Sequence, residues 1–156
     1  MSPTPTMAPE TSAGRARRVR WAAVAFVLTS VYTTVVSVRE RLPGRPFGIG
    51  VPLSVPAGLL LGWGSAVAAP WPMPVGALVA ARRAERDGAD VRASSLVCAA
   101  IGVAGVLGLL MEPNTYDVHA HSRANRLGIA AGFVTTGTLA VAGLAAWRAE
   151  VRARQG

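Results

Sequence analysis

Four long runs without a charged residue dominate the chain, and short clusters rich in arginine separate them. The runs cover residues 21–38, 46–81, 93–111 and 127–147. Because a helix rises about 1.5 Å per residue, about 20 apolar residues cross the hydrocarbon core of a bilayer, which is about 30 Å thick. The pattern therefore predicts an all-α integral membrane protein, a four-transmembrane-helix bundle with short connections.

The first, third and fourth runs are simple in their lengths and flanking residues. They predict spans at about 19–38, 93–111 and 127–147. The third span should end at Glu112, because a residue before proline is disfavoured in helical geometry. A soluble helical bundle would need a wide polar face on each helix, and these segments lack one.

The second run is too short for two spans with a turn between them, and it is long for one span. Three prolines at alternate positions interrupt it: Pro70, Pro72 and Pro74. Each proline removes a backbone donor and clashes with the carbonyl group four residues earlier. We expect one kinked helix over about 55–81. The alternative is a span over 51–69 that stops at the prolines, with 75–86 lying along the membrane interface.

The distribution of arginine sets the expected orientation, because cytoplasmic loops of membrane proteins carry the excess of basic residues. Eleven arginines lie before the first run, between the second and third, and after the fourth; five lie in the other two loops. We therefore expect a multi-pass protein of the cell membrane with both termini in the cytoplasm. Residues 1–18 are predicted to be a disordered cytoplasmic tail, and residues 149–156 a second cytoplasmic tail.

The formal net charge of +8 would by itself fit a nucleic-acid-binding protein. The arginines instead flank apolar runs, as in loops that contact anionic lipid headgroups. We expect the lipid bilayer as a partner and no nucleic acid. The GxxxG spacing of Gly58 with Gly62 and of Gly128 with Gly132 fits helix packing within one chain, a homo-oligomer or a membrane protein partner.

The first run carries hydroxyl side chains at helical spacing. Thr29, Thr33 and Ser37 follow one another at intervals of four residues and would share one helix face. Such hydroxyl groups bond carbonyl groups of their own helix or reach a neighbouring helix. Two interpretations stay open: packing contacts between helices, or the lining of a polar cavity beside the proline break.

The second outer loop, residues 112–126, contains both histidines of the chain. In an extended conformation Asp117, His119 and His121 would project to one side. Two imidazoles and a carboxylate could hold a divalent metal such as Zn²⁺ or Fe²⁺. Glu112 could add a further ligand or act as a base. The alternatives are an ordinary solvated loop and a loop that packs against the first outer loop; no other cofactor is expected.

The first outer loop carries three arginines: Arg39, Arg41 and Arg45. These residues could hold anionic lipid headgroups, or they could pair with Glu112 and Asp117 of the second outer loop. The second possibility would bring the two outer loops together on one face of the bundle.

Three functional classes fit these observations. The first is a non-catalytic accessory or structural membrane component, since every charged residue lies at a span end or in a loop and no catalytic motif occurs. The second is a binder or transporter of a small or lipidic molecule. The third is a membrane-surface enzyme or metal site in the second outer loop. We favour the first class, and with it a protein that is not an enzyme.

Overall fold

The computed structural model describes residues 11–50, 52–62, 64–86, 90–117 and 121–155. Within these ranges the chain is helical, and the only β-type pairing is a single bridge between Pro43 and Ser65. The elements are α1 (Ser12–Arg39), η1 (Pro46–Gly48), α2 (Val55–Leu60), α3 (Pro72–Ala84), α4 (Val91–Met111), η2 (Pro113–Thr115) and α5 (Arg123–Ala153). The predicted all-α class is confirmed.

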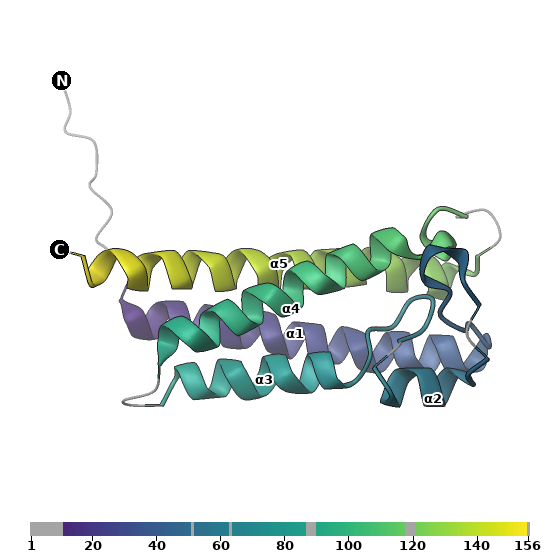
Figure 1. The fold of residues 1–156 in the computed structure, drawn as a ribbon, viewed down its shortest axis with the longest axis horizontal. Coiled ribbons are helices and arrows are strands. Elements are labelled where there is room, and N and C mark those ends of the chain that lie inside the picture. Colours follow the sequence, from purple (N-terminus) through teal and green to yellow (C-terminus); the bar gives the residue numbers. More distant parts are fainter. Residues whose placement is uncertain (1–10, 51, 63, 87–89, 118–120, 156) are drawn as a thin grey trace, which may run out of the picture.

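The helices α1, α3, α4 and α5 form one elongated bundle (Figure 1). The start of α1 and the end of α5 lie at one end of it, which we call the terminal end. Residues 40–50, 52–54, 112–117 and 121–122 lie at the opposite end, the loop end. The helices α1 and α4 run from the terminal end to the loop end, and α3 and α5 run back. Each of the four helices is thus antiparallel to the next one along the bundle, although residues 40–71 separate α1 from α3.

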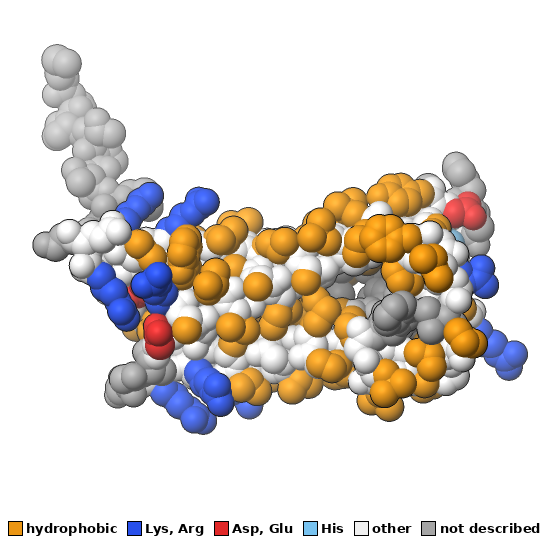
Figure 2. All heavy atoms as spheres, in the orientation of Figure 1, with side chains coloured by type: hydrophobic (Ala, Val, Ile, Leu, Met, Phe, Trp, Pro, Cys, Tyr) orange, Lys and Arg blue, Asp and Glu red, His pale blue; other side chains and the backbone are white. Residues whose placement is uncertain are grey.

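Three helices, α1, α4 and α5, are long and apolar enough to cross a membrane. Figure 2 shows arginine side chains gathered at the ends of the bundle and hydrophobic side chains over its middle. Exposed apolar residues such as Leu28, Val103 and Val141 belong to this middle zone, and such a surface suits contact with lipid. The findings support a membrane protein. A fourth span is not confirmed, because the 13 residues of α3 reach only about 20 Å.

The kinked helix expected over about 55–81 is absent, and so is the alternative helix over 51–69. α2 ends at Leu60 and α3 begins at Pro72; the described residues between them, 61–62 and 64–71, are non-helical and are called segment 61–71. The chain turns at Gly62 and Gly64, whose φ angles are +92° and +76°. Only glycine adopts such angles without strain. The break therefore begins at glycines, well before the prolines, and α3 packs in the bundle against α1 and α4.

The prolines allow α3 to begin inside the bundle. The first N–H groups of a helix have no acceptor within the helix and need another partner. Three residues at this start have no N–H group: Pro70, Pro72 and Pro74. The N–H groups between and after them are all bonded to carbonyl oxygens: Trp71 to Leu59 (3.0 Å), Met73 to Pro70 (2.9 Å) and Val75 to Trp71 (3.2 Å). The first turn of α3 therefore offers no free N–H group.

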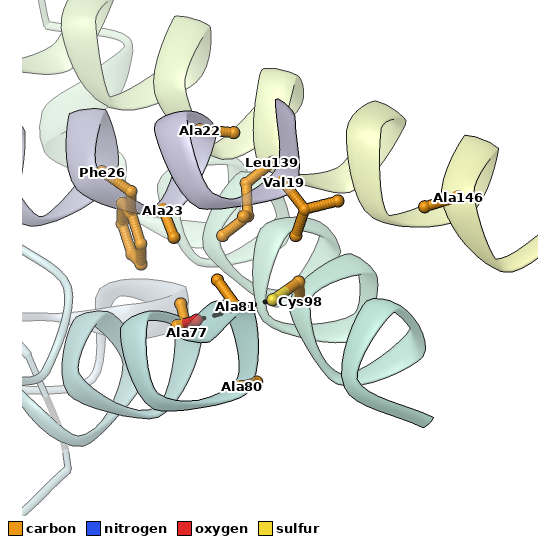
Figure 3. Close-up of a cluster of buried hydrophobic side chains, with 10 residues drawn as sticks. All are labelled: Val19, Ala22, Ala23, Phe26, Ala77, Ala80, Ala81, Cys98, Leu139 and Ala146. Atoms are coloured by element: carbon orange, nitrogen blue, oxygen red, sulfur yellow. Dashed lines mark hydrogen bonds between the residues drawn. The ribbon is translucent and has the colours of Figure 1, made fainter. Parts of the chain in front are cut away.

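Small side chains fill the terminal half of the bundle, which comprises α3 and the parts of α1, α4 and α5 that surround it. The buried cluster drawn in Figure 3 contains Val19, Ala22, Ala23, Phe26, Ala77, Ala80, Ala81, Cys98, Leu139 and Ala146. The backbones of α4 and α5 touch at Gly143, where an added Cβ would lie 2.6 Å from the nitrogen of Ala99. This half is a tightly packed core.

The first and last helices of the chain, α1 and α5, extend further than expected at the terminal end. Residues 12–18 form the first turns of α1, and α5 continues to Ala153, so these parts of the predicted tails are helical. Thr11 caps α1 by accepting a hydrogen bond from the N–H of Gly14 (3.2 Å). Glu150 of α5 accepts from Ser12 Oγ and pairs with Arg15, both at 2.7 Å. Residues 1–10 of the first tail lie outside the described residues.

Candidate functional site

A cavity of about 230 Å³ lies in the loop half of the bundle, between α1, segment 61–71, α4 and α5. Here the described residues between α2 and α3 are non-helical, and most of those that line the cavity are small: Gly62, Gly64, Ser65, Ala66, Ala68 and Ala69. The wall combines apolar residues such as Phe26, Met73 and Leu109 with a few polar groups. In Figure 2 the surface is hollowed beneath the part of α4 nearest the loop end.

Hydroxyl groups from two helices line the cavity. Ser30 and Thr33 come from α1 and Thr136 from α5, and each is only 2% exposed. Each hydroxyl donates to a carbonyl oxygen of its own helix: Ser30 to Phe26 (2.8 Å), Thr33 to Thr29 (2.9 Å) and Thr136 to Gly132 (2.7 Å). Because the protons are used within the helices, the oxygen lone pairs are what these hydroxyl groups can offer a ligand.

The predicted hydroxyl stripe of α1 divides between the two interpretations. Thr29 and Thr33 line the cavity. Ser37 is fully buried, and its Oγ lies 2.7 Å from Ser65 Oγ in segment 61–71. Ser65 Oγ also accepts from the N–H of Ala68 (3.0 Å). Ser37 thus holds the non-helical segment against α1, and the cavity lies just beyond this contact.

Glu112, directly after α4, is the only carboxylate that the described wall of the cavity contains. The residue is 6% exposed. Its two carboxylate oxygens share the backbone N–H of Arg45, at 3.1 and 3.0 Å. Burial raises the pKa of Glu112, and the hydrogen bond and charge of Arg45 oppose that rise in part. The two outer loops therefore meet at Glu112, through the backbone of Arg45 rather than through its guanidinium group.

The second outer loop is described only in part. Asp117 is exposed, and His121 places its Nε2 atom 2.6 Å from the carbonyl oxygen of Asn114. His119 lies outside the described residues. Among the residues that are described, no three His, Cys, Asp or Glu side chains come close enough to hold a metal. The divalent-metal site at Asp117, His119 and His121 stays a prediction.

No family model, curated protein or solved structure matches this chain. The functional argument therefore rests on the chemistry of the cavity itself. Its wall contains hydroxyl oxygens, one carboxylate and mainly apolar surface. Such a combination of apolar lining with a few placed polar groups is typical of a binding site for a small molecule.

Sequence reasoning named hydroxyl residues of α1 and Glu112 but missed Ser65 and Thr136, which also line the cavity. Thr136 had a detectable signal, because it is a hydroxyl residue within the apolar run 127–147. Ser65 had a weaker one. It lies in a stretch of glycine, serine and alanine whose non-helical path depends on contacts with α1 and the first outer loop.

Proposed function

We propose that this protein is a non-catalytic, four-pass membrane protein that binds a small, largely apolar molecule inside its helical bundle. The observation that carries the proposal is the cavity of about 230 Å³ between α1, segment 61–71, α4 and α5. A dry cavity of about 150 Å³ in a soluble protein is large enough to bind benzene. The cavity here has room for a molecule somewhat larger than a single aromatic ring.

Two features support a second crossing by residues 40–90. The helices α1 and α4 run in the same direction, so the chain between them has to return along the bundle. The prolines at the start of α3 leave no free N–H group there, as a helix that begins within a membrane requires, because hydrocarbon offers no hydrogen-bond partner. Non-helical backbone at this depth is tolerated where protein surrounds it.

The excess of arginine at the terminal end supports a cytoplasmic location for both termini in the cell membrane. An accessory or structural role in a larger assembly and a role in transport are both compatible with binding. A purely structural protein would have no ligand in its cavity. The proposal is therefore tested by ligand binding rather than by assembly.

The test compares two glycines at which an added Cβ would meet nothing within 4 Å. Gly108 of α4 borders the cavity, whereas Gly137 of α5 borders a separate surface groove. The full chain, Gly108→Phe and Gly137→Phe would be placed in lipid nanodiscs. Binding of benzyl alcohol, a neutral probe of suitable size, would be measured by equilibrium dialysis against empty nanodiscs.

We expect saturable binding of about one benzyl alcohol per chain, because the cavity is a single, partly open pocket of about 230 Å³. Gly108→Phe should abolish it by filling the cavity, and Gly137→Phe should preserve it. Uptake equal to that of empty nanodiscs, or equal loss in both variants, would contradict the proposal. Circular dichroism of each variant checks that both retain the helical fold.

A further inference from the structure

The carboxylate of Glu112 has unused hydrogen-bonding capacity at the wall of the cavity. A carboxylate accepts about four hydrogen bonds, and the structure gives this one a single donor, the N–H of Arg45, shared between its two oxygens. The residue is 6% exposed, so little water is available to complete its shell. Burying a charged group without a full set of partners is costly, and a ligand that supplies donors and positive charge would offset that cost.

The other polar groups described in the wall also favour a ligand that donates hydrogen bonds over one that accepts them. The protons of Ser30, Thr33 and Thr136 are already directed to their own helices, so their oxygens are left to accept. The start of α3, which would ordinarily attract an anion, has no free N–H group because of its prolines. No arginine is among the described residues that line this cavity. An anion in the cavity would be repelled by Glu112, and Arg45, whose charge acts on Glu112, borders a groove at the loop end rather than the cavity.

Glu112 also separates the cavity from the surface at the loop end. A groove there is bordered by residues of both outer loops, among them Arg45 and Asp117. Two residues, Ala66 and Glu112, line both the groove and the cavity. A molecule that enters through this groove reaches the carboxylate before it reaches the apolar interior.

We infer that the ligand is a compact amine, whose ammonium group binds the Glu112 carboxylate while its apolar body occupies the cavity. The inference rests on the proposed function, since it names the chemical class of the molecule that the cavity binds. The ammonium donates to Glu112 and to hydroxyl oxygens of the wall, and its charge compensates the buried carboxylate. The remaining surface of the ligand contacts apolar residues such as Phe26, Met73 and Leu109.

Three probes of nearly equal shape test this inference: benzylammonium, benzyl alcohol and benzoate, each measured by equilibrium dialysis against the full chain in phosphatidylglycerol nanodiscs and against empty ones. We expect benzylammonium to bind at least about tenfold more tightly than benzyl alcohol, the ratio that a charge-assisted hydrogen bond provides. Benzoate should bind most weakly. This ranking needs no variant, so it does not depend on the folding of a mutant.

The matched variants are Glu112→Gln and Asp117→Asn. Both replace a carboxylate of the same loop by an amide of equal shape, but Asp117 is exposed at the groove and does not line the cavity. Glu112→Gln should lose the preference of about tenfold for benzylammonium and keep the binding of benzyl alcohol. Asp117→Asn should retain both.

The ammonium group could belong to a soluble amine or to an ethanolamine lipid headgroup. Repeating the benzylammonium measurement with phosphatidylethanolamine added to the nanodiscs separates these sources. If phosphatidylethanolamine weakens benzylammonium binding to the unaltered chain but not to Glu112→Gln, the ammonium group belongs to the lipid headgroup. If benzylammonium binding is unchanged, the ligand is a soluble amine.

The failure of this inference differs from the failure of the proposed function. If benzyl alcohol binds and Gly108→Phe abolishes it, but benzylammonium binds no more tightly, the cavity binds ligands and the amine preference is wrong. Tightest binding of benzoate would likewise overturn the inference. If none of the probes binds above the level of empty nanodiscs, both proposals fall.

Discussion

The two halves of this bundle are built from the same helices but packed in opposite ways. In the terminal half, α3 lies between its neighbours and alanine side chains bring the helices together into a core without a described cavity (Figure 3). In the loop half, α3 is replaced by the non-helical segment 61–71, and a cavity of about 230 Å³ remains. The comparison teaches that the position at which one helix begins decides whether a bundle is solid or hollow.

The buried polar residues that the structure describes are divided unevenly: Ser94 and Ser95 of α4 lie in the terminal half, and the others lie in the loop half. Hydrophobic residues, mostly alanine, make up the buried cluster of the terminal half. The buried hydroxyl and carboxylate groups of Thr33, Thr136 and Glu112 lie around the cavity of the loop half. Since buried polar groups are costly without partners, their concentration at one cavity is what distinguishes a binding site from a packing defect.

The largest expected effect is a destabilisation of the terminal half by a substitution between α4 and α5. In Gly143→Ala the new Cβ would lie 2.6 Å from the nitrogen of Ala99 and 2.7 Å from the carbonyl oxygen of Ser95. Both atoms belong to the backbone of α4 and cannot move aside without separating the helices. We expect a loss of about 2 kcal/mol in the free energy of unfolding. Denaturant unfolding in detergent micelles, followed by circular dichroism, measures it.

The control for this variant is Gly137→Ala in the same helix, where an added Cβ meets nothing within 4 Å. It should unfold at the same denaturant concentration as the unaltered chain or a higher one. A stability of Gly143→Ala equal to that of Gly137→Ala would show that α4 and α5 are not in close contact.

The next effect is a gain in the free energy of unfolding, from a substitution in the loop half. Gly108→Ala adds a methyl group where nothing lies within 4 Å, and alanine restricts the unfolded chain more than glycine does. We expect a gain of about 0.5–1 kcal/mol in the free energy of unfolding. The same denaturant titration checks it. A destabilisation as large as that of Gly143→Ala would mean that the loop half is as tightly packed as the terminal half.

The smallest effect is a pH dependence that belongs to the loop half alone. Burial raises the pKa of Glu112 above its ordinary value of 4.5. Between that value and the raised one, the folded chain holds a proton that the unfolded chain has released, so stability falls as the pH rises through this window. The charge of Arg45 opposes the shift, and Asp117 borders the same groove as Glu112.

Thermal unfolding at a series of pH values from about 4.5 upward measures this dependence. The difference between the unaltered chain and Glu112→Gln isolates the contribution of this carboxylate, because all other titrating groups are common to both proteins. A difference that grows in favour of the unaltered chain as the pH rises would reverse the predicted sign.

The sequence predicted the three long helices well and the second run poorly. A long apolar run leaves a chain little alternative to a helix in a membrane, because every backbone group needs an internal hydrogen bond. At 46–81 the same rule did not distinguish a kinked helix from a broken one. The outcome depends on Ser37 and Leu42, which form hydrogen bonds with Ser65 and Ala66 of segment 61–71 from more than 20 residues earlier in the chain.

For the candidate site, the chemical groups were visible in the sequence but their grouping was not. Thr29 and Thr33 were identifiable from helical spacing alone. That Glu112 would be buried against the backbone of Arg45 was not predictable, because it requires two loops to meet whose contacting residues are 67 positions apart. A contact between these loops through arginine side chains was one of two possibilities left open by the sequence; in the structure the contact is made by the backbone N–H of Arg45.

The sequence alone determined that this protein is helical, that three of its helices can cross a membrane and that its arginines gather at the helix ends. These properties follow from local runs of residues and from the energy of burying a charge. Only the tertiary structure decided that α3 begins at Pro72, and this start leaves the space for the cavity. The reason is that a backbone can leave the helical conformation inside a bundle only where neighbouring elements complete its hydrogen bonds.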